Sequence, residues 1–299
     1  MSRFAAAALR AGSALMIAVA AAGLGMVSAQ TAITQATSSG LRVVSVGGAL
    51  TEIVYALGAE KLLVAVDTTS LHPAAALQLP KVGYMRQLSA EGVLSMKPSV
   101  VLATTEAGPA NVMTQLRDAK VSLEIVNADH SFAELRAKVR TVAKAVGRES
   151  EGQAFDAKLR KEMDDAQLWV AKQSSKPRVL FILSHTGSPQ VSGDGTAADA
   201  FIKLIGGVNV MTGFQGYKPL TVEGAVAAQP DVILTTSQGI TAVGGADKLL
   251  SQPGLALTPA GKNKRVVAME ASYLLGFGPR LPQAVREAAE RVRENKAAS

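Results

Sequence analysis

The chain has 299 residues, of which 48% are hydrophobic and 18% are charged, and this composition excludes a disordered protein. Its formal net charge of +7 is spread along the sequence without a block of Lys and Arg, which argues against a nucleic-acid-binding surface. Cysteine is absent, so disulfides, thiolate catalysis, thiolate zinc sites and iron–sulfur clusters are excluded.

Residues 1–29 are predicted to be a signal peptide that is removed. Arg3 and Arg10 precede an apolar run rich in Ala and Gly, and Val27-Ser28-Ala29 fits a small-residue cleavage site. The alternative is a transmembrane anchor, which the clean cleavage pattern disfavours. Residues 30–40 are mostly small and polar and predict a flexible leader. We expect a mature protein that has no membrane span and is exported to the periplasm.

Beyond the leader, short runs rich in Val, Ile and Leu alternate with helical patterns. Such runs are typical of buried parallel strands in α/β proteins. The predicted strands fall into two series, which are 41–46, 62–66, 99–103 and 123–126, and then 178–183, 231–235 and 265–269.

The stretch that separates the two series predicts one long helix. An apolar stripe recurs there every three or four residues, formed by Phe155, Leu159, Met163, Ala166 and Val170. The predicted fold class is therefore α/β, with two Rossmann-like lobes, 41–148 and 176–299, joined by one long backbone helix, 149–175. We expect the ligand cleft to lie between the lobes.

An internal repeat indicates that the two lobes are related. Residues 88–104 and 220–236 align without a gap, 132 positions apart, and seven of seventeen positions are identical. Each copy reads as a capped helix, a Pro that ends it and a buried strand, and each follows a Gly-Tyr pair. Related lobes that face one another form a cleft, which is a usual place for a ligand.

Each copy of the repeat carries one glutamate near the start of its helix. Ser89 and Thr221 occupy the predicted N-cap positions, and Glu91 and Glu223 follow two residues later. A carboxylate there stabilises the helix dipole by about 0.3–1 kcal/mol. The two exposed carboxylates could equally dock onto a partner with two basic sockets, and the residues alone leave both interpretations open.

Five motifs stand out, which read GYMRQLSAEG at 83–92, SHTG at 184–187, GTAADA at 195–200, GYKPLT at 216–221 and LGFGPR at 275–280. Together they resemble the periplasmic haem-binding proteins of bacterial ABC importers, within the wider family of cobalamin- and siderophore-binding periplasmic proteins. The resemblance covers nearly the whole mature chain. It implies a non-enzymatic protein that binds haem in the cleft and delivers it to an ABC permease and its ATPase. It also favours the docking role for Glu91 and Glu223, because that family pairs one Glu on each lobe with permease arginines.

The resemblance also implies a set of haem ligands. From the residues alone, Tyr84 and Arg86 could be a solvated surface pair or a phenolate supported by a guanidinium, on one side of an extended loop. The resemblance makes Tyr84 the axial ligand of the haem iron and Arg86 its support. His185 is a possible second ligand, since some family members supply a histidine from the second lobe and others do not.

The remaining candidates are weaker by motif. Tyr217 is the repeat partner of Tyr84, and Lys218 and Arg280 are candidates for contacts with the haem propionates. We expect no metal other than the haem iron, because nothing in the sequence fixes His72 and His130 together with His185. Two other functions stay open: a siderophore or cobalamin carrier of the same family, and a secreted hydrolase. The hydrolase is disfavoured, since no Gly-x-Ser-x-Gly elbow is present.

Overall fold

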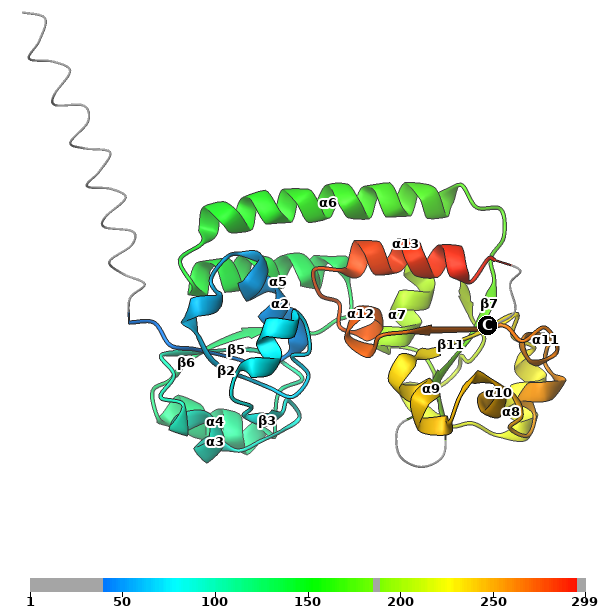
Figure 1. The fold of residues 1–299 in the computed structure, drawn as a ribbon, viewed down its shortest axis with the longest axis horizontal. Helices are drawn as coiled ribbons and strands as arrows, with labels where there is room; N and C mark the ends of the chain where they lie inside the picture. Colours follow the sequence, from blue (N-terminus) through cyan, green and yellow to red (C-terminus); the bar gives the residue numbers. More distant parts are fainter. Residues whose placement is uncertain (1–39, 185–188, 295–299) are drawn as a thin grey trace, which may run out of the picture. The chain divides into compact units, whose positions relative to one another are not determined.

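The computed structural model describes residues 40–184 and 189–294. The predicted signal peptide, residues 30–39 of the predicted leader, and His185 lie outside the described residues. From Arg42 onward the chain forms one compact unit, in which most strands belong to two sheets (Figure 1). This arrangement confirms the predicted α/β class.

The first sheet has four parallel strands. Their order is β2 (Leu63–Val66), β1 (Val43–Ser45), β5 (Val100–Thr104) and β6 (Ser122–Val126). All four were predicted, and each boundary lies within two residues of its expected position. Every residue of β1 and β5 is buried, as expected for parallel strands covered on both faces.

The second sheet is mixed rather than wholly parallel. Its order is β10 (Tyr217–Pro219), β8 (Gln190–Ser192), β7 (Arg178–Leu183), β11 (Val232–Thr236) and β12 (Val266–Met269), with β9 (Val208–Asn209) also paired to β7. The three long strands were predicted and are parallel to one another. The short strand β8 runs antiparallel to both of its neighbours, β7 and β10. The sequence analysis missed β8 and β10, because they are too short and too polar to stand out as apolar runs. Pro219 ends β10 at the edge of the sheet, where the missing N–H costs no ladder bond.

The helices surround both sheets. They are α2 (Gly48–Ala56), α3 (Ala90–Ser95), α4 (Ala110–Asp118), α5 (Phe132–Ala145), α6 (Glu149–Ala171), α7 (Ala197–Leu204), α8 (Val222–Ala228), α9 (Ser237–Val243), α10 (Ala246–Leu250), α11 (Pro259–Lys262), α12 (Ala271–Leu275) and α13 (Leu281–Arg291), with short 3₁₀ turns at Glu60–Leu62, Ala74–Gln78 and Leu255–Leu257. Within the described ranges, no helix has the length and apolar character needed to cross a membrane.

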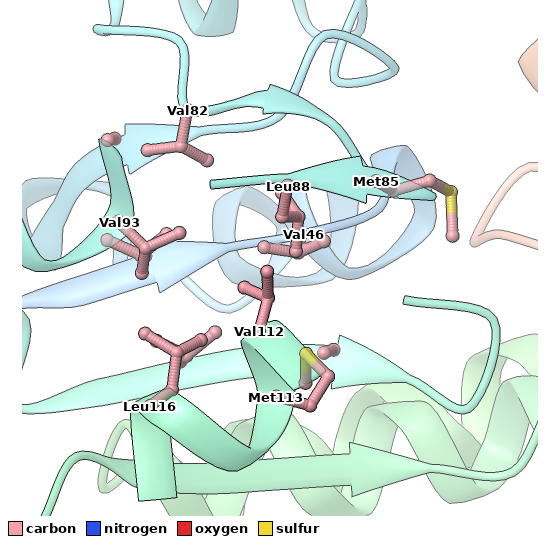
Figure 2. Close-up of a cluster of buried hydrophobic side chains, with 12 residues drawn as sticks. Val46, Val82, Met85, Leu88, Val93, Val112, Met113 and Leu116 are labelled. Atoms are coloured by element: carbon pink, nitrogen blue, oxygen red, sulfur yellow. The ribbon is translucent and has the colours of Figure 1, made fainter. Parts of the chain in front are cut away.

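A hydrophobic core fills the space between the first sheet and helices α3 and α4. Val112, Met113 and Leu116 on α4 pack toward strand residues of the sheet (Figure 2). Met85 and Leu88 belong to the same cluster, although they come from a short hairpin made by β3 (Gly83–Tyr84) and β4 (Gln87–Leu88). The hairpin is therefore anchored in the core by two of its own side chains.

Helix α6 lies between the two series of strands in the sequence, at the predicted place. Leu159, Met163 and Ala166 of the predicted stripe are buried, and α6 lies alongside α5 and α13 (Figure 1). Gly152 permits the close approach to α5, because a Cβ at this position would lie 2.4 Å from the Cβ of Ala143. The role of α6 as a rigid link between lobes stays a prediction.

The two copies of the repeat have the same local structure. Ser89 Oγ accepts a hydrogen bond from the Gly92 N–H at 3.3 Å, and Thr221 Oγ1 accepts one from the Gly224 N–H at 3.0 Å. Each helix is followed by a left-handed residue just before the Pro, Lys97 with φ 48° and Gln229 with φ 41°. The strand of each copy then lies between two parallel neighbours. The gapless alignment thus corresponds to one structural unit used twice.

Candidate ligand site

Tyr84 projects from the β3–β4 hairpin. Tyr84 pairs with Gln87, so Met85 and Arg86 form a two-residue turn between the strands. The sequence predicted an extended loop here, and the tight turn corrects that prediction. Gly83 precedes the tyrosine with φ 101°, a conformation that favours glycine. Met85 is buried, whereas Tyr84 as a whole residue remains 39% exposed.

One guanidinium joins the tyrosine to a carboxylate. Arg86 Nη1 donates a hydrogen bond to Tyr84 Oη at 2.7 Å, and Arg86 Nη2 forms an ion pair with Glu106 Oε1. Burial tends to lower the pKa of Arg86, but the hydrogen bonds and charges of Tyr84 and Glu106 outweigh it and raise the pKa. Arg86 therefore stays cationic beside the phenol oxygen.

Glu106 is a member of this group that the sequence analysis missed. It follows β5, at the carboxyl end of a central parallel strand, where ligand-binding residues of α/β sheets commonly lie. Its position after a predicted parallel strand was the sequence signal that could have identified Glu106 as a site residue. The sequence did not reveal its partner, because the contact with Arg86 depends on how the hairpin folds back onto the loop.

Tyr217 occupies the corresponding place in the second copy of the repeat. It stands opposite Ser192 in the antiparallel pair of β10 and β8, and the hydroxyls of Thr196 and Ser192 act to lower the pKa of its phenol. Burial raises the pKa of Tyr217, and the charges of Arg86 and Glu106 also act on it. The positive charge of Arg86 opposes that rise and the negative charge of Glu106 adds to it, so the two tyrosine groups of the repeat are coupled electrostatically.

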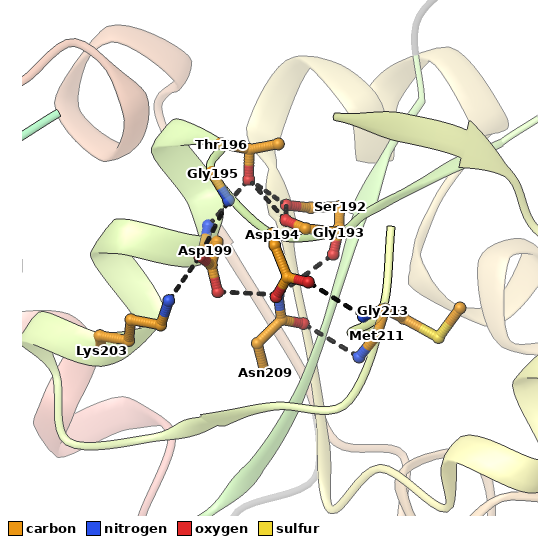
Figure 3. Close-up of polar contacts among 10 residues, drawn as sticks. All are labelled: Ser192, Gly193, Asp194, Gly195, Thr196, Asp199, Lys203, Asn209, Met211 and Gly213. Atoms are coloured by element: carbon orange, nitrogen blue, oxygen red, sulfur yellow. Dashed lines mark hydrogen bonds and ion pairs between the residues drawn. The ribbon is translucent and has the colours of Figure 1, made fainter. Parts of the chain in front are cut away.

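A polar network holds the elements around Tyr217. Asp199 Oδ1 accepts a hydrogen bond from Asn209 Nδ2 at 3.1 Å, and Asp199 Oδ2 accepts one from Lys203 Nζ at 2.7 Å (Figure 3). Asp194 Oδ2 accepts a hydrogen bond from the Gly213 N–H at 2.9 Å. Burial tends to raise the pKa of Asp199. The hydrogen bonds that Asp199 accepts from Lys203, Asn209 and the Gly195 N–H outweigh burial and lower the pKa. The network fixes the segment that leads into β10.

Lys218 does not join Tyr217. Successive residues of a strand point to opposite faces, and Lys218 stands opposite Val191, a residue of the hydrophobic core beside the second sheet. The Lys218 Nζ lies 4.5 Å from the ring centroid of Phe214. The structure therefore places this cation on the other face of β10 from the tyrosine.

Arg280 is also not brought to Tyr84 or Tyr217 by any described contact. It forms two hydrogen bonds with Glu52, from Nε to Oε2 at 2.9 Å and from Nη2 to Oε1 at 2.7 Å. A further contact reaches Glu270 Oε2 at 3.4 Å. The hydrogen bonds to Glu52 are the main cause that raises the pKa of Arg280, and burial opposes them.

Glu91 and Glu223 lie at equivalent exposed positions. Each is the second residue of its helix, and each follows a side-chain cap as predicted. Among the described residues, no group of three or more His, Asp or Glu side chains is placed to hold a metal ion. His130 packs against Phe277 with ring centroids 5.6 Å apart.

These features define an α/β ligand-binding protein with a tyrosine on each of two related units. The sequence also matches the family described as "Periplasmic binding protein" over residues 43–273. The chain belongs to this periplasmic binding protein family.

Two solved structures are similar over nearly all of their length. The periplasmic heme-binding protein BhuT in complex with two hemes is 45% identical, with a TM-score of 0.81, and the match covers 84% of this chain and 97% of BhuT. The periplasmic heme-binding protein RhuT from Roseiflexus sp. RS-1, in apo form, is 40% identical with a TM-score of 0.81, covering 85% of this chain and 98% of RhuT.

Two further relatives are more distant. An uncharacterized ABC transporter substrate-binding lipoprotein of Bacillus subtilis, YvrC, is 28% identical, covering 84% of this chain and 79% of the relative. A vitamin B12-binding protein of Vibrio cholerae is 26% identical, covering 82% of this chain and 87% of the relative. The similarities thus place the chain among substrate-binding proteins that act outside the cytoplasm.

Proposed function

We propose that the chain is the haem-binding protein of a bacterial ABC importer, which captures haem in the periplasm and delivers it to a permease and its ATPase. The observation that carries this proposal is the exposed phenol of Tyr84, held by the Arg86 guanidinium at 2.7 Å. The similarity to BhuT, a heme-binding protein at 45% identity, supports it. Haem is here the transported cargo, and we assign no enzymatic activity.

The chemistry of ferric haem suits this site. A phenolate oxygen is an established axial ligand of haem iron. When the phenol loses its proton, the adjacent Arg86 offsets the negative charge by donating an N–H to the same oxygen. The oxygen keeps a further lone pair for the iron. Tyr84 is therefore the proposed iron ligand, and Arg86 is its proposed support.

The other candidates take proposed roles around this ligand. Tyr217 would face the haem from the second lobe, and His185 would be a second iron ligand. Contacts of Lys218 and Arg280 with the propionates stay predictions, and both cations would have to leave their present partners to make them. Glu91 and Glu223 would meet basic sockets of the permease, and the removed signal peptide would direct the protein to the periplasm.

Titration of the purified mature protein with hemin tests the proposal. We expect a saturable Soret band and a visible charge-transfer band of the kind that phenolate ligation to ferric haem gives. Absence of a saturable spectral change would overturn the haem assignment. The titration endpoint also gives the number of haems bound.

A cobalamin carrier is the second candidate, because a vitamin B12-binding protein is among the relatives at 26% identity. Equilibrium dialysis against cyanocobalamin, run beside the hemin titration, separates the two. We expect binding of hemin alone. Retention of cyanocobalamin without a hemin signal would replace the proposed cargo.

A further inference from the structure

We infer that Glu106 is a positioning residue for the proposed iron ligand: its carboxylate holds the Arg86 guanidinium against the phenol oxygen of Tyr84. The inference rests on the proposed function, in which Tyr84 binds iron. It adds a third residue, which neither the motif nor the sequence analysis contains. Glu106 would act through Arg86, without touching the cargo itself.

The contact geometry assigns this role. The two terminal nitrogens of one guanidinium are used for two different partners, Nη1 for Tyr84 and Nη2 for Glu106. The side chain of Arg86 is 50% exposed, so without an anchor it would exchange among many rotamers in water. By binding Nη2, the Glu106 carboxylate selects the rotamer of Arg86 in which Nη1 donates to the phenol oxygen of Tyr84.

Backbone hydrogen bonds fix the carboxylate relative to the hairpin. The Gly108 N–H donates to the Met85 carbonyl at 2.9 Å, and the Leu88 N–H donates to the Gly108 carbonyl at 2.8 Å. The loop that carries Glu106 is thus bonded to the hairpin on both sides of Arg86, at Met85 and at Leu88. On its other side, the Thr105 N–H donates to the Val126 carbonyl at 2.9 Å. The backbone segments that carry Arg86 and Glu106 are therefore bonded to each other, so the contact between the two side chains does not depend on cargo.

The charges give Glu106 a second effect. A guanidinium alone withdraws electron density from the phenol oxygen, whereas a guanidinium shared with a carboxylate withdraws less. Glu106 therefore adjusts how strongly Tyr84 donates to iron. Two substitutions separate the effects: Glu106→Gln keeps an oxygen that can accept from Arg86 and removes the charge, and Glu106→Ala removes both.

The first test needs no haem. The tyrosines are labelled at Cζ with carbon-13, and the Tyr84 signal is assigned by its loss in Tyr84→Phe. We expect Glu106→Ala to shift the Tyr84 signal clearly and Glu106→Gln to shift it less. Glu60→Gln is the matched control, because the Glu60 charge acts on Tyr55 and should move that signal alone. A Tyr84 signal unchanged in Glu106→Ala overturns the inference.

The second test measures the hemin complex. For Glu106→Ala we expect hemin dissociation to be faster by about tenfold, as suits loss of a charge-assisted anchor. Glu106→Gln should restore most of the slow dissociation while its charge-transfer band stays displaced from the wild-type position. Wild-type dissociation and spectrum in Glu106→Ala would overturn the inference. If the wild-type protein binds no hemin, the proposed function fails, and the haem-free measurement still decides the role of Glu106.

Discussion

Arg280 and Glu52, which are 228 positions apart, form a bidentate ion pair in which the carboxylate is almost fully buried. The segment around Arg280 packs closely on the same region. Lys138 Nζ donates to the Phe277 carbonyl at 3.3 Å, and a Cβ at Gly278 would lie 3.3 Å from Ala49. The LGFGPR motif therefore contributes a contact between the C-terminal helices and helices α2 and α5.

Removal of Arg280 should destabilise the protein more than it affects haem. Arg280→Ala leaves the Glu52 carboxylate buried without its partner, and we expect a loss of about 3 kcal/mol in the free energy of unfolding. Urea denaturation measures this loss, and the hemin spectrum of the folded variant should match that of the wild type. Double substitution with Glu52→Gln should recover part of the stability, because the unpaired charge is gone.

A different result would support the expectation from the sequence that Arg280 contacts a haem propionate. A variant of normal stability with weakened hemin binding would place this guanidinium at a propionate. The structure makes the stability outcome the expected one, since Glu52 already accepts hydrogen bonds from Nε and Nη2 of the guanidinium.

Loss of the Tyr84 hydroxyl should change the iron coordination. Tyr84→Phe keeps the ring and removes the oxygen, so we expect the ferric charge-transfer band to disappear and hemin affinity to fall by at least tenfold. The spectrum and a hemin titration check both points. Tyr55→Phe is the control, because Tyr55 lies at the end of α2 and makes no contact in the described site. Unchanged spectra and affinity in Tyr84→Phe would exclude Tyr84 as the ligand.

The sequence predicted the parts of the fold that depend on burial. The long parallel strands appear as apolar runs, and the helix at Glu149–Ala171 appears as a periodic stripe, because both patterns repeat along a single element. The caps Ser89 and Thr221 were also predictable, since a cap bonds a backbone group only a few residues away.

The missed features depend on partners that are distant in the sequence. Glu106 lies 20 residues from Arg86, and nothing local shows that the hairpin folds back to meet it. The sequence suggested that Arg280 could bind a carboxylate of the cargo, because its partner Glu52 lies on α2, 228 positions away. A charged residue shows its chemistry in the sequence, whereas its partner is decided by the tertiary fold.

Acidification should weaken the network around Asp199. The folded-state pKa of Asp199 is lowered, so its contribution to stability is present above the ordinary aspartate pKa and is lost as pH falls through the lowered value. We expect Asp199→Asn to cost about 1–3 kcal/mol at neutral pH. The difference from wild type should shrink in acid, as measured by urea denaturation at several pH values.

Asp165→Asn is a control for this experiment, because Asp165 forms an exposed pair with Lys161 and should change stability little at any pH. The difference in free energy of unfolding between wild type and Asp199→Asn is the quantity to compare. If it stays constant from neutral pH into the acid range, the assigned role of the carboxylate charge is contradicted.

The two exposed glutamates of the repeat should act in transport and not in haem binding. Glu91 and Glu223 each lie in the first turn of a helix and make no contact with the tyrosine groups in the described structure. The double change Glu91→Ala with Glu223→Ala should leave the hemin spectrum intact and cost at most about 0.3–1 kcal/mol of helix-dipole stabilisation at each site. Paired charges of this kind orient docking and speed encounter more than they add affinity.

We therefore expect haem-stimulated ATP hydrolysis by the reconstituted importer to fall strongly with this double variant. The matched control is Glu149→Ala with Glu151→Ala, which removes two exposed carboxylates from the first turn of α6 and should leave stimulation unchanged. Each single variant should retain part of the stimulation, because one exposed ion pair is worth only about 0–1 kcal/mol. Full stimulation by the Glu91 and Glu223 double variant would show that these residues serve only their helices, and that the repeat kept them without a docking role.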